Sequence, residues 1–160
     1  RITMIKDKDS KSTIAPVVKS AQVSLPVEEA FKLFTEGVNT WWPLDGNHSV
    51  GEKSETETCS IEGWVGGRFI ETLKDGTESL WGTVQTFNPP YLFATTWHPG
   101  NSSELATYLE IQFSTADGGT LVELTHSGWE SRGEDAQKYR EGYNSGWDIV
   151  FGKYIEKTEK

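Results

Sequence analysis

The sequence predicts an α+β domain in which a strongly curved antiparallel sheet wraps around one long C-terminal helix. Three observations predict this fold: a short amphipathic helix after an N-terminal strand, strand-like segments separated by turn signals over residues 55–127, and a helical period over residues 131–157. A sheet with one apolar face and an amphipathic helix must bury each other. We therefore expect the long helix to pack against the sheet.

The first strand and the first helix are predicted from adjacent segments. From Val17 the pattern is strand-like through SAQVSL, and Pro26 then ends the strand and opens a helix over PVEEAFKLFTEG. Glu28 and Glu29 suit the positive end of the helix dipole, and Gly37 ends the helix. The apolar stripe of this helix consists of Ala30, Phe31 and Phe34.

Six or so antiparallel strands joined by hairpins are predicted over residues 55–127. The turn signals are Gly66-Gly67, Asp75-Gly76, Pro89-Pro90, Pro99-Gly100 and Asp117-Gly118-Gly119. Alternate residues of a strand share a face. In TYLEIQF and LVELTH the apolar faces are Thr107, Leu109, Ile111 and Phe113, and Val122, Leu124 and His126. One face of the sheet is thus covered and the other is solvated.

The last segment has the period of a helix some 20 to 25 residues long, about 30 to 37 Å at about 1.5 Å per residue. Ser131 and Glu134 have the spacing of a capping box at its start. Its aromatic and apolar stripe consists of Tyr139, Tyr143, Trp147, Val150 and Tyr154. This helix is long enough to cross a whole sheet.

Composition limits the classes of function. The 160 residues suit one domain, which we place over residues 13–160 after a flexible arm over residues 1–12. The net charge of -9 argues against a nucleic-acid or anionic membrane surface, and no apolar stretch is long enough to span a membrane. The first residues have no signal-peptide core, and Cys59 is the single cysteine, which favours a reducing, cytoplasmic location.

Three glycines lie inside the predicted long helix: Gly142, Gly146 and Gly152. Each destabilises the helix by about 1 kcal/mol relative to Ala, so we expect the absence of a side chain at these positions to serve packing or function. One interpretation is the close approach of a strand. The other is that Gly142 and Gly146 shape a cavity between the helix and the sheet.

Aromatic residues are the second sign of a cavity. The sequence has seven tryptophans, and indoles beyond the needs of a core tend to line pockets or interfaces. They can equally be core residues that fill the space between helix and sheet. The candidates that we expect to line a cavity are Trp42, Phe69, Trp81, Trp97, Leu109, Ile111, His126, Tyr143 and Trp147.

Catalytic and metal-binding motifs are weak in this sequence. The histidines, His48, His98 and His126, lack the spacing of a zinc or iron site, and Cys59 in TETCSIE has the setting of a small buried side chain. We expect no metal and no cofactor. Arg68 and Glu71 are either exposed strand charges or polar groups of a pocket, where burial would raise the pKa of the carboxyl.

Several motifs together carry a resemblance to a known family. They are LPVEEAFKLFT, WWPLDGNHSVG, the run G-x-V-x-x-x-x-P-P from Gly82 to Pro90, LVELTHSGW and GYNSGWDIVFGKYIE. With these motifs the chain resembles the START-like SRPBCC superfamily, and within it the group similar to the activator of the Hsp90 ATPase. The resemblance implies the helix-grip fold, in which a seven-stranded antiparallel sheet grips the C-terminal helix around a hydrophobic cavity.

Three functional hypotheses follow. The first is non-catalytic binding of a small hydrophobic, aromatic or lipid-like ligand between the helix and the sheet, with His126 and Tyr143 orienting a polar group. The second is an interaction module that contacts a chaperone or another protein, as the resemblance implies. The third is a polyketide-cyclase- or hydrolase-like enzyme that uses His126 with Glu71 or Tyr143 as acid/base groups.

Overall fold

One antiparallel sheet forms the body of the molecule. The computed structural model describes residues 14–45, 48–51 and 55–160, so the predicted arm over residues 1–12 lies outside the described residues. The seven strands are β1 (Val17–Val23), β2 (Thr56–Ile61), β3 (Arg68–Leu73), β4 (Glu78–Asn88), β5 (Leu92–Trp97), β6 (Thr107–Ala116) and β7 (Gly119–Ser127). Their order is β1-β7-β6-β5-β4-β3-β2, so successive strands pair as hairpins while β1 closes onto β7.

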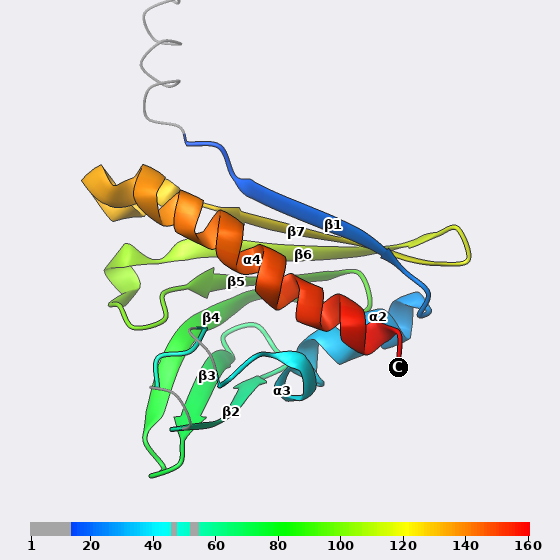
Figure 1. Cartoon of the computed structure of the whole chain (residues 1–160), viewed down its shortest axis with the longest axis horizontal. Helices are drawn as coiled ribbons and strands as arrows, with labels where there is room; N and C mark the ends of the chain where they lie inside the picture. The colour runs from blue at the N-terminus through cyan, green and yellow to red at the C-terminus, as the bar shows by residue number, and fades with distance from the viewer. Residues whose placement is uncertain (1–13, 46–47, 52–54) are drawn as a thin grey trace, which may run out of the picture.

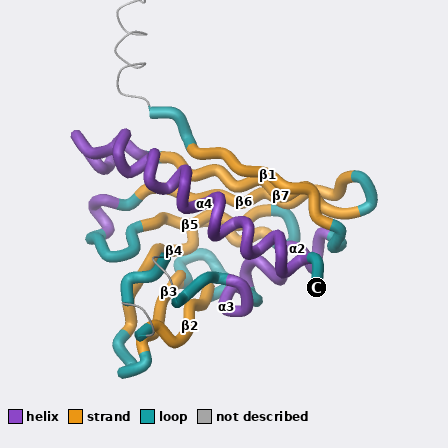
Figure 2. The backbone as a smooth tube through the Cα atoms, viewed as in Figure 1, coloured by secondary structure: helices purple, strands orange, loops and turns teal. Residues whose placement is uncertain are grey.

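The long helix α4 (Ala136–Thr158) crosses one face of this sheet (Figure 1). The shorter helices α2 (Val27–Thr35) and α3 (Val38–Trp41) lie in the connection between β1 and β2, near the C-terminal end of α4 (Figure 2). The hydroxyl of Tyr154 in α4 donates a hydrogen bond of 2.8 Å to the carbonyl of Ala30 in α2. This architecture confirms the predicted helix-grip fold.

The burial of the strands follows the predicted alternation. In β6, Leu109, Ile111 and Phe113 are buried, and in β7 Val122 and Leu124 are buried between more exposed neighbours. Burial of one such side chain contributes about 1.5–3 kcal/mol. The covered face of the sheet therefore supplies much of the stability that holds α4 in place.

The start of the long helix differs from the predicted capping box. Residues Trp129–Asp135 form a 3₁₀ segment, and α4 begins only after it, at Ala136. The hydroxyl of Ser131 donates instead to the carbonyls of Leu105 and Gly128, at 3.2 Å each. The capping box is wrong because Gly133, with φ 63° and ψ −130°, breaks the helical path between Ser131 and α4.

Candidate ligand-binding cavity

A cavity of about 660 Å³ lies between the N-terminal half of α4 and two loops, the one after α3 and the β5–β6 connection. Its walls consist of Trp42, His48, Ser49, Val50, Trp97, Pro99, Gly100, Asp135, Lys138, Tyr139, Gly142, Tyr143, Gly146, Trp147 and Val150. Of these described residues, Trp97 alone belongs to a strand. The cavity thus lies along α4 from the N-terminal cap, Asp135, to the middle of the helix at Val150.

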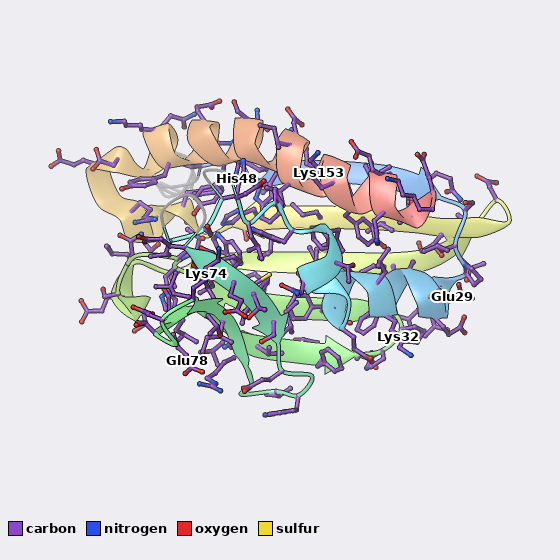
Figure 3. All side chains as sticks on the ribbon, turned by 60° about the horizontal axis from the view of Figure 1, so that its bottom comes forward. Glu29, Lys32, His48, Lys74, Glu78 and Lys153 are labelled. Atoms are coloured by element: carbon purple, nitrogen blue, oxygen red, sulfur yellow. The ribbon has the colours of Figure 1, made fainter. Side chains whose placement is uncertain are left out.

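Two helix glycines make room for this cavity. A Cβ atom added at Gly142 would meet nothing within 4 Å, and one at Gly146 would meet only Cε1 of His48, at 3.9 Å. Figure 3 shows His48 beside α4. No strand approaches either glycine within that distance, so the second interpretation, open space, fits these two positions. Nothing in the structure explains Gly152, which also faces open space but does not line the cavity.

The nine predicted lining residues divide into two groups. Trp42, Trp97, Tyr143 and Trp147 line the cavity, and their binding role stays a prediction. The others lie in the core, outside the cavity wall: Phe69, Trp81, Leu109, Ile111 and His126. They are fully buried, and the aromatic ones are covered by other rings: Phe69 and Trp81 pack against Trp42 and Trp97, and His126 packs against Trp129 and Tyr143.

Eight lining residues come from loops, the N-terminal cap or the first turn of α4 and were not predicted: His48, Ser49, Val50, Pro99, Gly100, Asp135, Lys138 and Tyr139. Loop residues carry no hydrophobic period, so periodicity does not find them. The Pro99-Gly100 turn signal and the row of helix glycines were the available signals. They mark the two sides of the cavity.

The tryptophans explain how an aromatic core and a cavity coexist. The ring centroid of Trp42 lies 5.2 to 6.0 Å from the ring centroids of four other aromatic residues: Phe69, Trp81, Trp97 and Trp147. Six indoles are buried, and each N–H donates over 2.8 to 3.2 Å to an acceptor. The acceptors are the carbonyls of Leu33, His48 and His126, Oε1 of Glu71, the hydroxyl of Tyr143 and Nδ1 of His126. These rings are fixed in orientation before any ligand arrives.

Both ring nitrogens of His126 are engaged inside the core. The indole N–H of Trp147 donates to Nδ1 over 2.9 Å, so Nδ1 carries no proton. Nε2 therefore carries the proton of the neutral ring and donates to the hydroxyl of Thr107, 2.6 Å away. That hydroxyl in turn donates to the carbonyl of Trp97 over 3.2 Å. The contacts fix a single neutral tautomer.

The environment also keeps His126 uncharged. Burial, together with the positive charge of Arg132, lowers the pKa of His126 to about 3. Protonating the ring would place a proton on Nδ1 and expel the indole donor. His126 is fully buried and does not line the cavity, so it does not supply the acid/base group that the third hypothesis requires.

Glu71 is a buried carboxylate that holds the loop beside the cavity. It accepts hydrogen bonds of 2.8 Å from the N–H groups of Val50 and Gly51, 2.5 Å from the hydroxyl of Thr56 and 2.8 Å from the indole of Trp81. Burial favours a higher pKa, but these four donors outweigh it and lower the pKa of Glu71. The expected raised pKa is wrong, and so is the exposed alternative for this side chain.

Tyr143 is a polar side chain of the cavity wall. Its oxygen accepts the indole N–H of Trp97 over 3.2 Å. Burial raises the pKa of Tyr143, against smaller lowering effects of that hydrogen bond and of Arg132. The phenol is therefore a neutral donor at neutral pH. Within the described parts of the chain its proton meets no acceptor, which leaves it available to a ligand.

The remaining polar candidates lie outside the cavity. Arg68 is exposed and pairs with Glu62 at 2.8 Å and Glu78 at 3.4 Å. Cys59 is buried, and burial raises the pKa of its thiol to about 12. Among the described residues there is no cluster of three or more metal-ligating side chains, and no helix there is long and apolar enough to cross a membrane.

The curved sheet, the gripped helix and the adjoining cavity define a START-like protein of the SRPBCC superfamily. A family model described as "Activator of Hsp90 ATPase homolog 1-like protein" matches residues 24–157. The chain belongs to this family. No curated protein matches the sequence.

Solved structures agree with this assignment. The chain is 15% identical to the Aha1 dimer protein from Colwellia psychrerythraea, with a TM-score of 0.63 and coverage of 89% of this chain and 95% of that one. It is 19% identical to protein MLL2253 from Mesorhizobium loti, with a TM-score of 0.60 and coverage of 88% and 94%. It is 33% identical to Txn09, an anthrahydroquino-gamma-pyrone synthase complexed with SUM, with a TM-score of 0.55 and coverage of 79% and 85%.

Proposed function

We propose that this protein binds a planar, hydrophobic aromatic molecule in the cavity between α4 and the two loops. The observation that carries the proposal is the cavity itself, about 660 Å³ in volume and walled by aromatic rings where two helix glycines leave space. Ligand pockets for small molecules span about 300–1,000 Å³ and are mostly apolar with a few polar groups. The cavity fits that description, with Tyr143 as a polar group.

The fixed rings favour a flat ligand. Trp42, Trp97 and Trp147 each donate their N–H to a protein acceptor, so they offer the cavity mainly the faces and edges of their rings. Aromatic pairs stabilise a complex by about 0.5–1.5 kcal/mol beyond the area they bury. The name of the synthase that is 33% identical to this chain specifies a polycyclic aromatic product, which supports the same ligand class.

Tryptophan fluorescence tests the proposal, with anthraquinone-2-carboxylate as the probe. We expect saturable quenching by the wild-type protein. We expect Gly142→Leu to weaken binding at least about ten-fold, because the added side chain occupies cavity volume. Gly152→Leu is the matched control, since it adds the same side chain to the same helix away from the cavity. Equal affinities for the probe in the wild type and in Gly142→Leu would contradict the proposal.

A ring-closing reaction on the same ligand is the second candidate function, favoured by the 33% identity to a synthase. Tyr143 would then donate its proton to a ligand oxygen, because His126 and Glu71 are engaged in the core. The test is mass spectrometry of product formed from an anthrahydroquinone precursor of a fused pyrone. Turnover that is lost in Tyr143→Phe supports this function, and the absence of turnover excludes it.

A further inference from the structure

We propose that the cavity selects aromatic ligands that carry an anionic oxygen, a phenolate or a carboxylate, and that Lys138 and Tyr143 hold this oxygen. The inference rests on the proposed function and specifies the chemistry of its ligand. It starts from the ionisable side chains in the cavity wall, which are His48, Asp135, Lys138, Tyr139 and Tyr143.

Lys138 lies on the same face of α4 as Gly142 and Gly146, and it is the one of the three that has a side chain. Residues four apart lie on one face of a helix, and Lys138, Gly142 and Gly146 follow at that spacing and all line the cavity. Lys138 is therefore the member of the row whose side chain reaches beyond the helix backbone. Among the residues that the structure describes, no carboxylate lies within 4.0 Å of its ammonium group.

Tyr143 supplies the second donor. Its hydroxyl accepts from the indole of Trp97, and a hydroxyl that accepts one hydrogen bond donates a stronger one. Hydrogen bonds to an ionised acceptor are roughly twice as strong as neutral ones. A ligand that places an anionic oxygen between Tyr143 and Lys138 thus satisfies the phenol proton and the ammonium together.

Arg132 is a second cation close to the cavity, in contact with the lining residue Tyr139. The guanidinium of Arg132 lies 3.9 Å from the ring centre of Tyr139, and its buried Nε has no hydrogen-bond partner in the described part of the chain. Burial raises the pKa of Tyr143, and the charge of Arg132 opposes part of that rise. Two cations thus gather here in a chain whose net charge is -9.

The other titratable groups around the site do not reverse this charge. Burial lowers the pKa of His48, and His126 is held neutral, so neither ring adds charge at pH 7. Asp135 is the one carboxylate in the cavity wall; it lies at the N-terminal cap of α4 and is exposed, as Lys138 is, so water screens both charges.

Two probes of equal shape test the inference: anthraquinone-2-carboxylate and its neutral analogue, anthraquinone-2-carboxamide. We expect the wild type to bind the carboxylate about ten-fold more tightly at low ionic strength. Lys138→Gln should bring this ratio close to one. Lys153→Gln is the control, because it removes the same charge from α4 outside the cavity (Figure 3) and should keep the preference.

A spectroscopic measurement adds a readout that a loss of packing would not move. The absorption of 2-hydroxyanthraquinone differs between its phenol and its phenolate. We expect its pKa to fall when it binds the wild type, and to return toward the free value in Lys138→Gln and in Tyr143→Phe. Equal binding of the two anthraquinone probes by the wild type would overturn the inference and leave the proposed function standing. Absence of binding by either probe would overturn both.

Discussion

The indole N–H of Trp147 donates a hydrogen bond to Nδ1 of His126 over 2.9 Å, and this contact joins α4 to β7. Trp147 lines the cavity with its ring while its N–H enters the core. The same bond requires an unprotonated Nδ1, so the position of an aromatic wall depends on the neutral state of a buried histidine.

Replacing Trp147 by Phe tests this dependence. The change keeps an aromatic ring but removes the donor to Nδ1, so the neutral form of His126 loses a hydrogen bond. We expect the pKa of His126 to rise and the free energy of unfolding to fall by about 1–3 kcal/mol. Nuclear magnetic resonance of the imidazole follows the titration. An unchanged His126 titration in Trp147→Phe would show that the bond does not control the protonation state.

The buried histidine also makes stability depend on pH. The pKa of His126 is about 3 in the folded protein and about 6.5 in an unfolded chain. Between these values the unfolded state binds more protons, so stability is fully present above pH 6.5 and is lost as the pH falls. The slope attributable to His126 is up to about 1.4 kcal/mol per pH unit.

Urea unfolding between pH 7 and pH 5 measures that slope. We expect His126→Gln to be less stable at pH 7 but to lose less stability on acidification than the parent protein. Both proteins should carry His48→Gln, because the pKa of His48 is also lowered by burial. A slope that is the same with and without His126 would refute the assignment.

Replacing Gly142 by Ala should increase the stability of the protein and weaken ligand binding. Gly142→Ala should raise the free energy of unfolding by up to about 1 kcal/mol, because the new Cβ meets no atom within 4 Å and Ala is the better helix former. It should also weaken probe binding, since the methyl group enters the cavity. Gly152→Ala should give a similar stability gain with unchanged affinity. Denaturation and titration of both variants check this, and unchanged affinity in Gly142→Ala would count against the cavity.

Glu71 connects a strand to the loop that walls the cavity. Glu71→Gln keeps the size of the side chain but replaces an oxygen that accepts N–H groups with an amide donor. We expect a loss of about 2–3 kcal/mol and weaker probe binding, because one oxygen is lost: either Val50 and Trp81, which donate to Oε1, or Gly51 and Thr56, which donate to Oε2, then face an amide donor. Glu78→Gln on the neighbouring strand, whose exposed carboxylate pairs with Arg68, should change stability by less than about 0.5 kcal/mol. Similar losses in the two variants would contradict the role of Glu71 in holding the loop that contains Val50 and Gly51.

The contribution of Glu71 to stability depends on pH with the same sign as that of His126. The hydrogen bonds lower the pKa of Glu71, so its contribution is present above the pKa of an unfolded Glu, about 4.3, and is lost as the pH falls through the folded value.

The fold could be predicted because the signals are local. The alternation in β6 and β7 and the period of α4 each follow from neighbouring residues, whereas the sequence left open whether Gly142 meets a strand or open space. The start of α4 could not, because the sequence does not show that Gly133 leaves the helical path or that the hydroxyl of Ser131 bonds to Leu105, 26 residues earlier.

The site was only partly predictable for the same reason. Trp97 and Trp147 are visible as surplus indoles, but whether a ring faces a cavity or the core depends on loop residues such as Pro99 and Gly100 that are brought to it by the fold. Glu71 gains three of its four donors from Val50, Gly51 and Thr56, which lie 15 to 21 residues away. No period or motif in the sequence encodes such a contact.

Native mass spectrometry of the protein purified from its own host tests the central claim most directly. We predict a reproducible extra mass under gentle conditions that disappears on denaturation and is absent from Gly142→Leu purified in the same way. A mass equal to that of the chain alone, in the wild type and under the same gentle conditions, would contradict the claim that the cavity holds a small molecule.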